Sequence, residues 1–252
     1  MKTGYAAMAL ISLSLLASCG KGDAPGGAPS AASIASEPAL PTGASLAPAT
    51  TETGTAAAPL LKAASYPPRD DCTAQPGWAE FRARLEQAVA RRDAAALITL
   101  TSPDVQLDYG GGHGLAEMKK RLTDKDYKLW DQIAALLPLG CGFKDGQAFL
   151  PWIFWNAPED ADPYAAMLVL GPDVPAYAKA STAAPMVATL NWALVAMAEG
   201  SSPDGTFAKV TLPGGGKTAY VENTKLRSVI DYRLIAERGK QGWRITALIA
   251  GD

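Results

Sequence analysis

Residues 232–249 read YRLIAERGKQGWRITALI, and the fold of the chain depends on where this stretch packs. Two apolar-rich segments, 232–237 and 243–249, flank the turn Gly239-Lys240-Gln241-Gly242. Segments of this length joined through a glycine-bounded turn predict a β-hairpin. Because two strands alone are marginally stable in water, the hairpin needs a partner layer. We expect it either to pack against the helices that precede it or to extend a sheet.

The helices are expected upstream, between residues 73 and 137. An amphipathic helix over 73–92 is predicted by apolar residues at helical spacing, namely Trp78, Phe81, Leu85 and Val89. Asp93 then caps a short helix, and a strand from Val105 to Tyr109 follows. Residues 115–137 predict two more helices, and the apolar run 149–155 predicts a buried strand. We therefore expect a helical α+β domain over 67–163.

The sequence pattern changes from helical spacing to short strands after the acidic segment 159–163. Short apolar strands at even spacing predict a small β-barrel over 164–228. The strands are expected at 167–170, 186–190, 194–197, 207–212 and 219–221. The whole is α+β: the helical domain, the barrel and a terminal hairpin over 229–252. A helical layer with returning strands would resemble the cystatin-like or nuclear-transport-factor-like architecture, a comparison of folds only.

Residues 168–228 resemble the bacterial Src-homology-3-like domain. The residues that carry the resemblance are Val174, Ala176, Ser181, Thr182, Pro185, Val187, Leu190, the run 207–210 and the run 216–221. Four positions depart from the family pattern: Tyr177 stands for arginine, Ala180 for proline, Phe207 for tryptophan and Ala219 for glycine. The resemblance implies a binding or targeting module of the cell envelope, in some members for peptidoglycan peptides. Four aromatic side chains form either its core or its ligand groove: Tyr177, Trp192, Phe207 and Tyr220.

The N-terminus resembles a bacterial lipoprotein signal. Lys2, the apolar run 6–16 and the lipobox Leu16-Ala17-Ser18-Cys19 fit a signal peptide over residues 1–18. The resemblance implies an acylated Cys19 that anchors the chain to a membrane facing the periplasm, since two or three acyl chains hold stably. Gly20, in place of an aspartate, favours the outer membrane. An ordinary cleaved signal is the other interpretation.

Residues 19–66 are rich in Ala, Pro, Ser, Gly and Thr. Such a segment buries too little apolar surface to offset the entropy of ordering it, so we expect a disordered tether. An acylated Cys19 leaves Cys72 and Cys141, which an oxidising periplasm would join in a disulfide. Buried free thiols are the alternative.

Composition excludes several function classes. The formal net charge of −2 and the lack of long Lys/Arg runs exclude a nucleic-acid footprint. His113 could pair with Asp108 and a serine, but the chain has no Gly-x-Ser-x-Gly elbow. The loop 110–114 lacks a phosphate-binding pattern, and 159–162 lacks the glycine and glutamate of a calcium loop. We expect no metal, cofactor or catalytic residue.

The expected function is therefore non-enzymatic binding of a peptide or cell-wall component at the envelope. A protein scaffold that holds an envelope partner through its helical domain is the alternative, and an enzyme in the α+β part is a third interpretation. The aromatic residues Trp152, Phe154 and Trp155 are either core or a second groove for a sugar or peptide.

Overall fold

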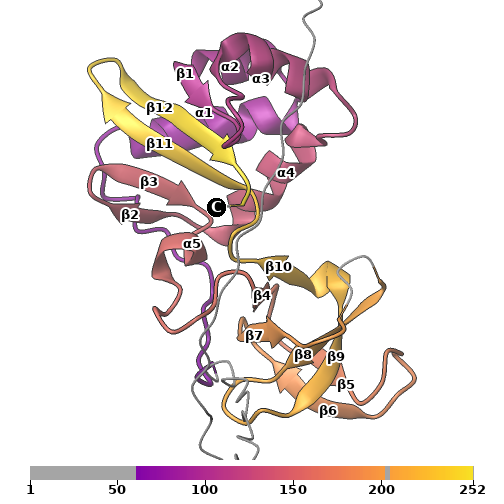
Figure 1. Cartoon of the computed structure of the whole chain (residues 1–252). Coiled ribbons are helices and arrows are strands. Elements are labelled where there is room, and N and C mark those ends of the chain that lie inside the picture. Colours follow the sequence, from indigo (N-terminus) through magenta and orange to yellow (C-terminus); the bar gives the residue numbers. More distant parts are fainter. Residues whose placement is uncertain (1–60, 202–204, 252) are drawn as a thin grey trace, which may run out of the picture. The chain divides into compact units, whose positions relative to one another are not determined.

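The computed structural model describes residues 61–201 and 205–251, which form helices and two β-sheets (Figure 1). The α+β class is confirmed. Cys19, the lipobox and most of the expected tether lie outside the described residues. Within the described part, no helix is long and apolar enough to cross a membrane.

The first sheet has five strands and is built around the terminal hairpin. Its order is β1 (Thr101–Gln106), β12 (Gly242–Ile249), β11 (Arg233–Gly239), β3 (Gln147–Leu150) and β2 (Gly142–Lys144). The hairpin pairs antiparallel from Arg233 opposite Ile249 to Gly239 opposite Gly242. Strand β12 runs parallel to β1, and β11 runs antiparallel to β3. The helical domain is thus discontinuous in sequence, because residues after 228 complete its sheet.

Four helices cover one face of this sheet. They are α1 (Trp78–Ala90), α2 (Ala94–Thr99), α3 (Gly114–Thr123) and α4 (Leu129–Leu136), followed by the single turn η1 (Leu137–Leu139). The first helix begins at Trp78 rather than 73, because Gly77 takes a left-handed conformation with φ 76°. Asp93 caps α2 as expected, accepting from the Ala96 amide at 2.9 Å. Helices and hairpin share one core, which includes Trp78, Leu85, Ile133, Leu234 and Ile245.

The composition of the apolar run 149–155 predicted a single strand, and this prediction is wrong. Strand β3 ends at Leu150, the Leu150–Pro151 peptide bond is cis, and a short helix α5 (Ile153–Asn156) follows. Proline has no amide hydrogen to continue the ladder, so the strand stops there. The short helix α5 then places the rings of Phe154 and Trp155 against Phe149 of β3.

The second sheet has seven strands and is open. Its order is β10 (Leu226–Ser228), β4 (Ala166–Val169), β7 (Leu194–Met197), β8 (Phe207–Thr211), β9 (Thr218–Glu222), β5 (Val174–Tyr177) and β6 (Met186–Leu190). No described strand joins β10 to β6, so the expectation of a closed barrel is corrected to an open sheet. The hairpin of β5 and β6 meets β9 through the single pair Tyr177 and Tyr220, which leaves β6 as an edge. A single turn η2 (Asn223–Lys225) precedes β10.

The segment before α1 contacts both sheets. Residues 61–66, expected at the end of the tether, bond to the second sheet: the Gly214 amide donates to the Leu61 carbonyl at 2.7 Å, and the Tyr66 amide donates to the Trp192 carbonyl at 2.7 Å. Further along, Asp70 forms a β-bridge with Cys141. A third buried cluster, with Leu61, Trp152 and Leu194 among its members, packs along this segment.

Candidate functional site

Three of the four predicted groove residues lie together on the second sheet. In β8 and β9, Ala208, Val210, Ala219 and Val221 face the core. Because side chains alternate along a strand, Phe207 and Tyr220 face outward, and both are half-buried. Tyr177 joins them from β5, with its ring edge-on to Phe207 at 6.0 Å between centroids. We call Tyr177, Phe207 and Tyr220 the aromatic face.

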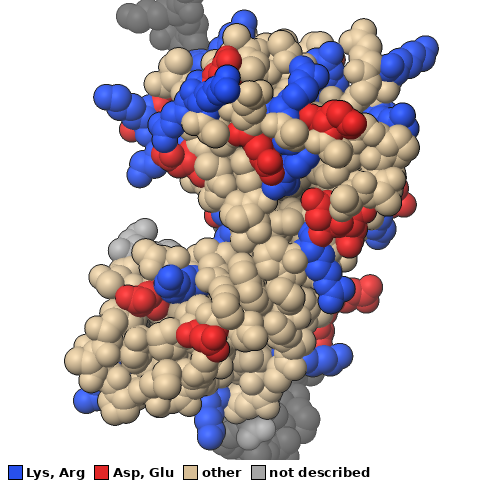
Figure 2. All heavy atoms as spheres, turned by 180° about the vertical axis from the view of Figure 1, so that it is seen from behind, with Lys and Arg blue, Asp and Glu red and all other residues tan. Residues whose placement is uncertain are grey.

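An exposed edge strand borders the aromatic face. Tyr177 is paired in register with Met186 on β6, and Met186 and Val187 are 61% and 52% exposed. Strand β6 pairs with β5 on one side only among the described strands. An exposed apolar edge is a place where an extended peptide can add as a further strand. Figure 2 shows, from behind, that charged side chains are sparse over the part formed by this sheet.

Trp192 does not belong to the aromatic face. It has a left-handed backbone with φ 46° in the connection between β6 and β7. Its side chain packs against the third cluster, with Leu61 and Leu194. Trp192 thus supports the segment that precedes α1, and the predicted groove is reduced to three residues.

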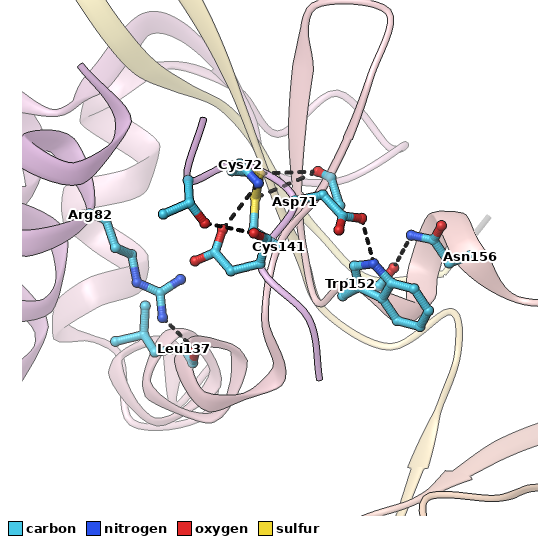
Figure 3. Close-up of a disulfide and its surroundings, with 10 residues drawn as sticks. Asp71, Cys72, Arg82, Leu137, Cys141, Trp152 and Asn156 are labelled. Carbon is cyan, nitrogen blue, oxygen red and sulfur yellow. Dashed lines mark hydrogen bonds between the residues drawn. A yellow bond between two sulfur atoms is a disulfide. The ribbon is translucent and has the colours of Figure 1, made fainter. Parts of the chain in front are cut away.

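Cys72 and Cys141 are joined by a disulfide (Figure 3). Both are fully buried, their Cα atoms are 5.8 Å apart, and 69 positions separate them in sequence. Backbone hydrogen bonds run beside the bond: Cys141 donates to the Arg69 carbonyl at 2.7 Å, and Asp71 donates to the Cys141 carbonyl at 2.8 Å. The disulfide therefore fixes the segment before α1 to the loop between η1 and β2.

Trp152 completes this junction and is not part of a groove. Its indole nitrogen donates to the Asp71 carboxylate at 2.7 Å, and the Arg69 guanidinium lies 5.2 Å from its ring centre. Asp70, Cys72 and Cys141 are the one group with metal-ligand spacing in the described part. Because both sulfur atoms are bonded to each other, neither is a thiolate that could bind a metal.

The loop 108–114 is folded around a carboxylate. The Asp108 carboxylate accepts from the amides of Gly110 and Gly112 at 2.8 and 2.7 Å and from the guanidinium of Arg121. The hydrogen bond from Arg121, then that from Gly112, holds the pKa of Asp108 below its ordinary value of 3.8. Asp108 is thus committed to shaping this loop.

His113 is likewise engaged by its own loop. Its Nδ1 lies 2.8 Å from the Gly111 carbonyl oxygen, and its backbone bridges to Gln106. Among the described residues, no hydrogen bond joins His113 to Asp108. The acidic segment has a turn role as well, since the Asp162 carboxylate accepts from the Tyr164 amide at 2.9 Å. Both features therefore make hydrogen bonds within their own loops.

A second group of aromatic side chains lies on the first sheet, on the face opposite the four helices. Phe154 and Trp155 of α5 meet Phe149 of β3, and the Trp155 ring stacks on Phe149 at 5.2 Å with 12° between planes. Together with Tyr109 and Arg233 they line a hollow of about 390 Å³. The sequence indicated Phe154 and Trp155 as groove candidates. Arg233 and Tyr109 were missed, because strand pairing between distant segments brings them there.

The comparisons with known proteins give little. No family model matches the chain, and no curated protein matches it. Among solved structures, it is similar to an NTF2-like protein with a cystatin-like fold from Novosphingobium aromaticivorans, with 13% identity and a TM-score of 0.25 over 68% of this chain and 75% of that one. It is also similar to a chain whose name contains NTF2, with 8% identity and a TM-score of 0.24 over 69% of this chain and 96% of that one. The order of the strands in both sheets follows from the hydrogen bonds between them in this chain.

Proposed function

We propose that the protein is a lipid-anchored, non-enzymatic binding protein of the cell envelope. Its ligand is a peptide or a cell-wall component, held on the aromatic face of the second sheet. The observation that carries the proposal is this face itself. Tyr177, Phe207 and Tyr220 come from three strands, meet at the surface, and leave part of each ring open to solvent.

The chemistry of the face suits an extended and weakly charged ligand. Aromatic rings offer large contact area with few rotatable bonds to order. The neighbouring edge of β6 has backbone groups for strand addition and the exposed side chains of Met186 and Val187. Lys209, which pairs in register with Tyr220, is a cation in this region that could meet a ligand carboxylate.

We further propose that the second sheet is a Src-homology-3-like module in an open form. The resemblance in the sequence supports this, and so does the strand path. Strands β4, β7, β8 and β9 follow one another as neighbours, and β10 returns to β4 after the single turn η2. The long hairpin of β5 and β6 is inserted between β4 and β7 in sequence. In this proposal that hairpin carries one wall of the ligand site.

The membrane anchor is proposed from the lipobox alone. If Cys19 is acylated, the chain should partition with membranes, and cells supplied with radiolabelled palmitate should incorporate the label into it. Replacement of Cys19 by serine should abolish the label and release the chain to the soluble periplasmic fraction. Labelling that persists in the Cys19→Ser variant would contradict the anchor without touching the binding proposal.

Binding is tested by titrating the full chain, by calorimetry, with soluble muropeptides and with a mixture of periplasmic peptides. Saturable binding is expected, and Tyr220→Ala should weaken it by about 10-fold or more, as for removal of a central aromatic contact. The control is Tyr164→Ala, because Tyr164 is 73% exposed and lies outside the aromatic face. Equal affinities of the Tyr220→Ala and Tyr164→Ala variants would contradict the assignment of the face.

A further inference from the structure

The hollow on the first sheet has a lining that is apolar on its floor and cationic above it. Phe149 and Ile249, at its floor, are each 4% exposed. The ring centre of Phe154 lies 6.0 Å from that of Phe149 and 6.1 Å from that of Trp155. Because Trp155 also stacks on Phe149, the three rings are in mutual contact. The volume of about 390 Å³ lies within the range of small-molecule sites. A flat or branched apolar group would find dispersion contacts on the aromatic rings of the floor.

Two cations are stacked on these rings. The guanidinium carbon of Arg233 lies 4.4 Å from the ring centre of Phe154, and the Nζ atom of Lys144 lies 4.6 Å from that of Trp155. A cation over an aromatic ring is attracted by the partial negative charge of the ring face, so these contacts favour the observed positions of both side chains. Asp145 is the acidic residue among the described residues that line the hollow.

Arg233 orients a third polar group, the hydroxyl of Tyr109. Its side chain is buried, and Nη1 donates to the Gly251 carbonyl at 2.7 Å. Its Nη2 donates to the hydroxyl oxygen of Tyr109. Because that oxygen accepts from a guanidinium, the hydroxyl hydrogen of Tyr109 is directed elsewhere and made a stronger donor. Tyr109 is 54% exposed, so this donor is accessible from solvent.

We propose that the hollow binds a small amphipathic monocarboxylate, with its aryl or alkyl body on Phe149, Phe154 and Trp155. The carboxylate would accept from the Lys144 ammonium and the Tyr109 hydroxyl. The carboxylate matches these two donors, and the apolar body matches the ring floor. Binding here is independent of the proposed function, since the aromatic face lies on the other sheet.

The test is calorimetric titration of the full chain with 4-phenylbutyrate and with 4-phenylbutanol, its uncharged counterpart. Saturable binding of the carboxylate is expected, with the alcohol weaker by about 10-fold, the loss expected for charge-assisted hydrogen bonds. Lys144→Gln and Tyr109→Phe should each weaken the carboxylate and leave the alcohol unchanged. Lys125→Gln and Tyr164→Phe, at exposed positions outside the hollow, are the matched controls.

The alternatives give distinct results. Equal affinity for acid and alcohol would overturn the carboxylate site, and so would equal losses from the site variants and their controls. A lack of saturation by 4-phenylbutyrate and by octanoate up to about 1 mM would overturn the proposal altogether. Thermal unfolding of each variant, measured in parallel, ensures that a lost signal is not a lost fold. Failure of the muropeptide titration leaves this site standing, and the reverse also holds.

Discussion

The indole rings of Trp78 and Trp243 meet edge to face, with their centres 5.1 Å apart. Trp78 is the first residue of α1, and Trp243 is the second residue of β12. The Trp243 indole nitrogen also donates to the carbonyl of Pro76 at 3.0 Å, just before that helix. The contact ties the two ends of the helical domain together, so the terminal hairpin is part of its core rather than an appendage.

Replacing Trp243 by alanine should therefore destabilise the whole chain. We expect a loss of about 3–5 kcal/mol in the free energy of unfolding, as for a large aromatic side chain removed from a core. Chemical denaturation followed by far-ultraviolet circular dichroism measures it. Trp155→Ala is the control, because Trp155 is 44% exposed and its loss should be less than half as large. Similar losses at both positions would mean that the hairpin is not central to the core.

The terminal hairpin and the helices were predictable because each depends on local patterns. Apolar spacing predicted a helix over 73–92, which contains α1, and the glycine-bounded turn predicted the hairpin of β11 and β12. The choice between the two sheets was not predictable. It depends on which surface the hairpin buries, and both candidate partners offered apolar strands. In the structure the hairpin packs against the helices, and Trp78 and Ile245, which are far apart in the sequence, belong to one core.

The closed barrel and the sites were predicted less well. Five of the seven strands were predicted from short apolar runs, whereas β5 and β10 were not, and closure depends on pairings such as Tyr177 with Tyr220 that no local pattern fixes. Tyr177, Phe207 and Tyr220 lie together because their strands present them on the same face of the second sheet. Trp192 lies elsewhere, in a connection where its backbone is left-handed. Arg233 was unmarked, since its role depends on Tyr109, more than a hundred positions away.

The disulfide should contribute about 4 kcal/mol to stability, because the Cys72–Cys141 bond closes a long loop in the unfolded chain. A double Cys72→Ser, Cys141→Ser variant should lose about this amount in denaturant unfolding. Cys19→Ser, which leaves the bond intact, should unfold like the parent. Wild-type protein that unfolds identically with and without reductant in the denaturant would contradict the assignment.

Gly140 should be irreplaceable for a steric reason. A Cβ atom there would overlap the backbone of Arg69, which the disulfide holds in place, and its φ of 76° already disfavours side chains. We expect Gly140→Ala to cost about 3 kcal/mol or more. Gly146→Ala separates the two causes, because Gly146 has a similar φ of 86° and no neighbour within 4 Å. It should cost about 1–2 kcal/mol. Equal costs would show that strain alone acts at Gly140.

Stability should fall in acid partly through Asp108 and Glu117. Hydrogen bonds from Arg121 are the largest cause that lowers the pKa of each below its ordinary value, 3.8 for Asp108 and 4.5 for Glu117. A lowered folded-state pKa gives stability that is fully present above the ordinary value and is lost as pH falls through the folded-state value. Unfolding measured from pH 6 down to about pH 2 should therefore show a shallower loss in Asp108→Asn than in the parent. Asp104→Asn, an exposed control, should follow the parent, and a parental slope in Asp108→Asn would contradict the role of this carboxylate.

The central claim is that the aromatic face binds an envelope ligand, and photo-crosslinking in intact cells tests it most directly. Benzoylphenylalanine is placed in turn at Tyr220, at the exposed control Tyr164 and at Lys119 on the helices. An adduct that contains cell-wall material or an envelope peptide is expected from position 220 and not from position 164. Adducts from position 119 alone, or identical products from 220 and 164, would contradict it, and the former would favour a scaffold that binds its partner through the helices.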